Sequence, residues 1–133
     1  MRRLLLALAA SAMLATTASA QSATATTTIA DVFLTAKPTD VLSYNLIGLN
    51  IQNDDKENVG EIKDLIISGG QLAGYIVSVG GFLGIGEHYV IVSPTAIKVK
   101  YNESEKKWSA SMPATKEQLK EAPEFKYEGR WGK

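Results

Sequence analysis

The chain has 133 residues, with 14 basic and 14 acidic side chains and no cysteine. This length predicts one domain, because a domain takes roughly 100 to 200 residues. The lack of cysteine excludes disulfides, thiol catalysis and cysteine metal sites, so packing alone must hold the fold together.

The first 20 residues have the order of a secretory signal peptide. Arg2 and Arg3 precede an apolar run at 4–14, and the small residues 18–20 form a cleavage site before Gln21. The apolar run is shorter than the roughly 20 residues that a helix needs to cross a bilayer. We therefore expect export, removal of the segment 1–20, and a product that is not an integral membrane protein.

The charge of the exported chain makes nucleic acid an unexpected partner. Removal of Arg2 and Arg3 leaves 12 of the 14 basic residues against 14 acidic ones, a formal charge of −2. Nucleic-acid binding normally needs a basic face that neutralises phosphates.

Residues 21–39 form a lead-in that is rich in threonine and alanine. Its first part, 21–30, is small and polar with little to bury, which predicts a flexible tether. Beyond Pro38 we place a compact domain at 40–127 and a tail at 128–133.

The first two strands are predicted from alternation along the chain. Ile47, Leu49 and Ile51 alternate with polar residues or glycine, which indicates a strand with one buried face. A polar turn follows at 53–58, and the next strand is expected at 59–67.

Asp64 lies within this second strand, between Ile62 and Ile66, which are expected to point inward. Regular alternation forces Asp64 onto the same apolar side unless a bulge shifts the register. Asp64 is then either a buried acid of the kind that catalysis uses or, as we favour, a structural acceptor of backbone amide hydrogen bonds at a bulge.

Four further strands are expected, at 72–79, 89–92, 97–101 and 107–112. The turn before the first of them is built on Gly69 and Gly70, because glycine tolerates the positive φ of tight hairpins. Lys98 and Lys100 lie on one face of the third, which is typical of a sheet edge.

A short helix is expected after the last strand. Thr115 and Gln118 have the spacing of a capping box, Leu119 is available to pack inward, and Pro123 ends the helix near Ala122. The chain is therefore predicted to be all-β, with five or six strands and one short C-terminal helix.

Four fragments have a distinctive order and spacing: S-x-x-L-I-G at 43–48, VGEIKDL at 59–65, GGFLGIG at 80–86 before V-x-V at 90–92, and QLKEAPEF at 118–125. Together they resemble the PRC-barrel family over about residues 40 to 127. The resemblance implies a small six-stranded PRC-type β-barrel.

Known settings of this family are the cytoplasmic domain of the photosynthetic reaction centre H subunit and part of a ribosome maturation factor. Neither specific role carries over to a free-standing exported domain. The resemblance does imply a non-catalytic protein-contact module without a cofactor, working in the periplasm with another envelope protein as partner. A small-ligand or calcium-binding domain is the alternative.

The glycine-rich segment 81–86 has the spacing of a phosphate-binding loop. Glu87 and His88 stand where lysine and serine or threonine are required, so phosphate binding is not expected. Apolar residues on a glycine-hinged loop can instead anchor a partner. The expected partner-binding residues are Gly81, Phe82, Leu83, Gly84 and Ile85. Alternatively, Phe82 and Leu83 fold back as a lid over one barrel end.

A weak calcium pattern lies in the first turn. On positions 1, 3, 5 and 12 of a calcium loop fall Asn53, Asp55, Glu57 and Asp64. Asn58 replaces the glycine of position 6, so calcium is kept only as the alternative. A histidine-rich metal site is excluded because His88 is the single histidine, and no serine lies in a hydrolase elbow. We therefore expect no catalytic residues.

Overall fold

The computed structural model describes residues 18–20, 22, 28–81 and 86–133. They belong to two units, Met1–Ala36 and Lys37–Lys133. In the first unit Thr28 caps a single 3-10 turn, because its amide and hydroxyl both donate to the Asp31 carboxylate. In neither unit do the described residues include a helix that is long and apolar enough to span a membrane.

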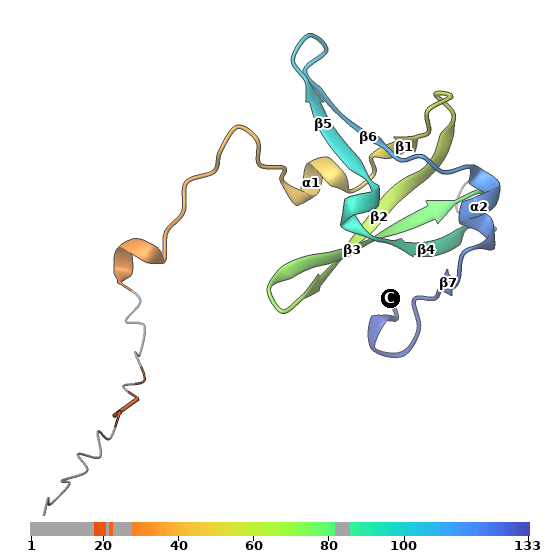
Figure 1. Ribbon diagram of the computed structural model, residues 1–133. Coiled ribbons are helices and arrows are strands. Elements are labelled where there is room, and N and C mark those ends of the chain that lie inside the picture. Colours follow the sequence, from red (N-terminus) through yellow and green to blue (C-terminus); the bar gives the residue numbers. More distant parts are fainter. Residues whose placement is uncertain (1–17, 21, 23–27, 82–85) are drawn as a thin grey trace, which may run out of the picture. The chain divides into compact units, whose positions relative to one another are not determined.

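The second unit folds into one mixed sheet and two short α-helices (Figure 1). In chain order the elements are α1 (Ser43–Leu46), β1 (Asn50–Gln52), β2 (Asn58–Ser68), β3 (Gln71–Val79), β4 (His88–Val92), β5 (Lys98–Asn102), β6 (Lys107–Ser111), α2 (Lys116–Glu121) and β7 (Glu124–Phe125). The strands lie in the order β5-β6-β1-β2-β3-β4-β7. Neighbouring strands are antiparallel, except β1 and β6, which are parallel.

The predicted all-β class with a short C-terminal helix is confirmed, but the described residues do not form a closed six-stranded barrel. Their sheet has seven strands and two open edges, β5 and β7. A barrel closes only when its edge strands pair with each other. This pairing fails because β7 is two residues long, while the exposed Lys98 and Lys100 on β5 are typical of an edge.

The pairing of β1 with β2 contains one irregularity. Ile51 pairs with Gly60 and Gln52 with Asn58, so Val59 is an extra residue on β2. The Gly60 position is also tightly packed. A side-chain carbon there would lie 2.9 Å from a backbone oxygen of β3, so only glycine allows the two strands to approach this closely.

A second irregularity separates Ile62 from Asp64. Ile62 pairs with Val77 and Asp64 pairs with Ile76, which leaves Lys63 as the extra residue. A bulge of this kind moves the following side chains to the opposite face. Asp64 therefore lies on the face of the sheet away from the core, which we call the outer face.

Two apolar side chains do not point where regular alternation predicts. Ile66 lies on the outer face while Leu65 packs against the core, because the bulge at Lys63 reverses the alternation. Ile47 is 43% exposed instead of buried. It directly follows α1, and Gly48, with φ of +88°, redirects the chain before β1 begins.

The core is aliphatic apart from Tyr75 and lies on one face of the sheet. Its largest fully buried side chains belong to β1, β2, β3 and β4: Ile51, Val59, Ile62, Val77, Val79 and Val90. Met112 and Leu119 of the C-terminal part join the same cluster. Burial of a large aliphatic side chain contributes about 1.5 to 3 kcal/mol, so this cluster is the main stabilising element of the domain.

The start of α2 matches its predicted capping box. The Gln118 amide donates to the Thr115 hydroxyl at 3.1 Å, and the Thr115 amide donates to the Gln118 side chain at 2.9 Å. The helix ends before Pro123. This cap fixes the direction of α2 and so directs Leu119 into the core.

Leu119→Ala is expected to lower the free energy of unfolding by about 2 to 5 kcal/mol, because it removes a buried side chain and leaves a cavity. Urea denaturation measures the change. Lys120→Ala, at the next, exposed position of α2, is the control and should change stability by less than about 0.5 kcal/mol. Equal losses in both variants would contradict the docking of α2 on the core.

Candidate functional site

A polar cavity of about 440 Å³ is bordered by β1, β2, β3 and the start of α2. Its charged lining residues are Glu61, Lys63, Glu87 and Lys116, and its other lining residues are asparagine, serine or glycine. The floor includes Ser78 of β3, which is buried. The cavity thus presents both signs of charge on a polar surface.

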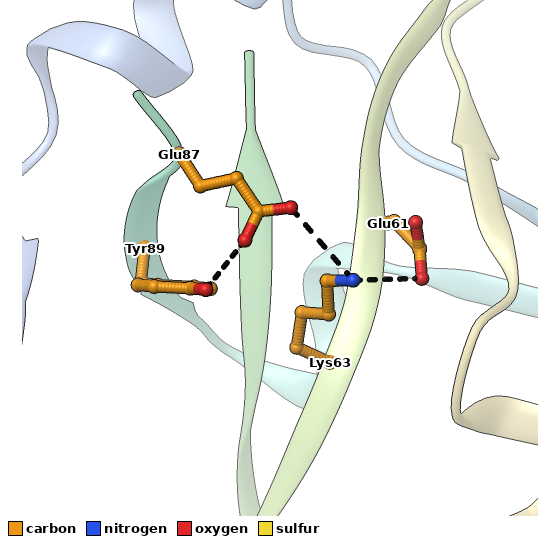
Figure 2. A network of polar contacts seen from close by, with 4 residues as sticks. All are labelled: Glu61, Lys63, Glu87 and Tyr89. Atoms are coloured by element: carbon orange, nitrogen blue, oxygen red, sulfur yellow. Dashed lines mark hydrogen bonds and ion pairs between the residues drawn. The ribbon is translucent and has the colours of Figure 1, made fainter. Parts of the chain in front are cut away.

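Lys63 lies between two carboxylates, as Figure 2 shows. Its Nζ is 3.2 Å from Oε1 of Glu61 and 3.8 Å from Oε1 of Glu87. The Tyr89 hydroxyl donates to Oε2 of Glu87 at 2.5 Å. Lys63, the extra residue in the pairing of β2 with β3, therefore connects β2 through Glu87 to the beginning of β4.

This network has a fixed pattern of charge. The hydrogen bond from Tyr89 holds the pKa of Glu87 below its ordinary value, and the Lys63 ammonium acts in the same direction against partial burial. The same hydrogen bond raises the pKa of Tyr89. Glu87 is therefore ionised and Tyr89 neutral near pH 7.

A second, apolar cavity of about 640 Å³ lies on the outer face. Isoleucines of β2, β3 and β4 line it together with aromatic residues that follow α2: Ile66, Ile67, Ile76, Ile91, Phe125, Tyr127 and Trp131. Gly74 leaves room for them, since a side-chain carbon there would lie only 3.0 Å from Ile91.

The segment that follows α2 is held on the sheet by aromatic contacts. The Tyr127 ring lies edge-on to both Tyr89 and Phe125, with centroids 5.2 and 5.1 Å apart, and Phe125 also contacts Trp131 at 5.8 Å. The Tyr127 hydroxyl donates to Oδ2 of Asp64 at 3.4 Å. Burial first, and then the Asp64 charge, raise the pKa of Tyr127 to about 12. The segment thus reaches from β4 to β2 across the outer face.

The family of the chain follows from a comparison with known protein families. The PRC-barrel domain matches residues 38–118, which is more than half of the chain. The chain belongs to the PRC-barrel domain family. This confirms the resemblance seen in the sequence fragments, and it indicates a small protein-interaction module. A search of curated proteins finds no match.

The match to the PRC-barrel domain ends inside α2. The aromatic segment with Phe125, Tyr127 and Trp131 therefore lies beyond the matched residues. In this chain the aromatic segment packs on the outer face of the sheet, and this segment is not part of the match to the PRC-barrel domain.

Asn53 organises the turn in which a calcium pattern is predicted. It is buried, and its Oδ1 accepts from the amides of Asp55 and Glu57, both at 3.0 Å, while its Nδ2 donates to Glu57 at 3.1 Å. Asp64 is not brought to this turn, because it lies six residues along β2, roughly 20 Å at the rise of a strand. In the described part of the chain, no three acidic or histidine side chains are placed to hold a metal ion.

Asp64 uses both carboxylate oxygens for contacts within the domain. Oδ1 accepts from the Leu65 amide at 2.9 Å, next to the bulge, and Oδ2 accepts from Tyr127. The first contact supports the irregular backbone, and the second holds the C-terminal segment.

The predicted partner-binding loop is mostly outside the described residues. Gly81 is described, is exposed and has φ of +80°. The other four members, Phe82, Leu83, Gly84 and Ile85, lie outside the described residues. The choice between anchor and lid stays a prediction.

Sequence reasoning missed the network around Lys63 and the aromatic segment. Glu61 and Lys63 alternate as on any solvated strand face, and no spacing rule connects them to Glu87. The aromatic segment did have a signal. Phe125, Tyr127 and Trp131 lie close together in a stretch that we expected to be partly tail, and such a density of large rings favours packing over a free end.

Asn53→Ala is expected to lower the free energy of unfolding by about 1 to 3 kcal/mol, because the turn amides lose their buried acceptor. Asp55→Ala, which keeps the backbone contact, should change it by less than about 0.5 kcal/mol. Thermal unfolding with and without calcium accompanies both measurements. A calcium-dependent rise in midpoint that Asn53→Ala abolishes would support an ion site instead.

Asp64→Asn is expected to lower the pKa of Tyr127 from about 12, but not fully to its ordinary 10.0, because burial persists. The pKa of Tyr127 is higher in the folded chain than in the unfolded chain, so the fold favours the neutral phenol. This contribution to the free energy of unfolding is fully present below pH 10 and is lost as the pH rises through about 12. NMR titration of ring-labelled tyrosine measures the pKa. Asp54→Asn, in the exposed turn, is the control, and an unchanged Tyr127 pKa in Asp64→Asn would refute the contact.

Proposed function

We propose that the protein is a non-catalytic contact module of the periplasm that binds another envelope protein through its outer face. The observation that carries this proposal is the apolar surface around the 640 Å³ cavity. Ile67 is 61% exposed, Ile91 51% and Trp131 64%. Membership of a family of interaction modules supports the same function.

The outer face has the composition of a contact surface. Exposed apolar side chains from three separate segments meet at one cavity, and contiguous patches of this kind mark sites of protein association. Trp131 is of the residue type that dominates the energetics of such interfaces. Asp64 and Lys133 also line the cavity and supply opposite charges for orienting a partner.

The single histidine is engaged with the C-terminal segment. His88 Nε2 lies 3.3 Å from the carbonyl oxygen of Ala122, and Nδ1 lies 3.8 Å from a carboxylate oxygen of Glu124. Neither contact is to a nucleophile. They connect β4 to the start of the C-terminal segment, which is a structural use of the imidazole.

Export rests on the signal-peptide pattern of residues 1–20, with its two arginines, short apolar run and small-residue site. The net charge of −2 after their removal favours a protein partner over nucleic acid. The periplasm is the compartment that fits both the pattern and the proposed partner.

A photoreactive amino acid placed at Ile91 of the full chain in cells is expected to capture one discrete protein. The same amino acid at Ser109, on the exposed face of β6, is the control and should not capture it. Fractionation of the same cells should recover the chain in the periplasmic fraction, shortened by residues 1–20.

With the captured protein purified, Trp131→Ser is expected to weaken binding at least about tenfold, or about 1.4 kcal/mol. Tyr44→Ser removes an exposed aromatic ring from α1, outside the outer-face cavity, and should leave the affinity unchanged. Two results would contradict an interface on the outer face. One is identical capture from the photoreactive positions 91 and 109, and the other is an affinity that Trp131→Ser does not change.

A further inference from the structure

Some of the charged groups that line the polar cavity are not fully used by contacts among the described residues. Lys63 is shared by Glu61 and Glu87, and both oxygens of Glu87 are engaged, one by Lys63 and one by Tyr89. This part of the network is internally satisfied, as the contacts in Figure 2 show.

Two charged groups of opposite sign are left for a ligand. Lys63 contacts Oε1 of Glu61, and no hydrogen bond among the described residues uses Oε2. Lys116, at the start of α2, takes part in no ion pair within the described part of the chain. The cavity therefore offers one carboxylate oxygen and one ammonium group, both among its lining residues.

The mixed charge argues against several ligand classes. A purely anionic ligand would be repelled by the carboxylates of Glu61 and Glu87. A purely cationic ligand would be repelled by the ammonium groups of Lys63 and Lys116. A divalent cation would need the space between the carboxylates, which the Lys63 ammonium occupies. An apolar ligand would remove water from charged groups without replacing its hydrogen bonds.

The size and lining of the cavity limit the choice further. A volume of 440 Å³ lies in the lower part of the range of about 300 to 1,000 Å³ that small-molecule sites occupy. None of the described lining residues is aromatic. The described lining offers charged groups and hydrogen-bonding groups, which suit small molecules that bind through both.

We propose that the cavity binds a small zwitterion that carries a free amino group and a free carboxylate, such as an amino acid or a short peptide. The ligand carboxylate pairs with Lys116, and the ligand ammonium pairs with Oε2 of Glu61. Asn50 and Asn58 also line the cavity; Oδ1 of Asn58 accepts from the Gly60 amide, while its side-chain NH2 group can still donate to the ligand's peptide group. This site is separate from the apolar cavity and does not depend on the proposed partner.

Diglycine is the probe that tests this inference, because it has both charges and no side chain. It is compared with its N-acetyl derivative, which lacks the ammonium, and with its amide, which lacks the carboxylate. NMR titration of the full chain is expected to shift the amides of the cavity residues, with diglycine binding about three- to tenfold more tightly than either derivative. Equal affinity of the three probes would overturn the proposal, as would no shift at concentrations up to about 10 mM.

Two variants assign the ligand's charges to residues. Lys116→Ala should abolish the preference for diglycine over its amide, and Glu61→Gln should abolish the preference over the N-acetyl derivative. Lys107→Ala removes an exposed lysine of β6 outside the cavity and should preserve both preferences. If Lys116→Ala keeps the preference over the amide, Lys116 is not the carboxylate partner and the proposal is wrong. The comparison of probes on the unaltered chain stands even if a variant fails to fold.

Discussion

The register of β2 is the constraint on which the rest of this domain depends. Two extra residues, Val59 and Lys63, interrupt its pairing with β1 and β3. The first interruption lets Val59 and Ile62 both enter the core although they are three residues apart. The second moves Asp64 to the outer face and supplies the lysine of the charged network. One strand therefore forms part of the core, the polar cavity and the apolar cavity.

The two cavities differ in chemistry because different segments complete them. The polar one is bordered by β1, β2, β3 and the beginning of α2, all inside the residues that match the family. The apolar one is completed by Phe125, Tyr127 and Trp131, which follow those residues. A domain of this size thus carries two separate cavities, one polar and charged and one apolar.

Local patterns in the sequence predicted local structure well. The strand predicted at 72–79, the Gly69–Gly70 turn and the Thr115 capping box depend on neighbouring residues, and the structure contains all three. The sequence did not predict β7 or the contact of Lys63 with Glu87, because both depend on segments that meet only after folding. A bulge was considered at Asp64, but its position could not be inferred, since alternation alone does not show which residue is extra.

The parallel pairing of β1 with β6 makes folding of this domain depend on nearly the whole chain. Ile51 and Ala110 are direct partners although most of the domain separates them in sequence. Contacts between such distant residues form slowly, because the loop that joins them must first be closed. A nascent chain that ends before β6 leaves one side of β1 without a partner and the core without Met112 and Leu119. The complete sheet and core therefore become available only after the residues of β6 and α2 have been synthesised, so the order of synthesis places the closing contacts of this domain near its end.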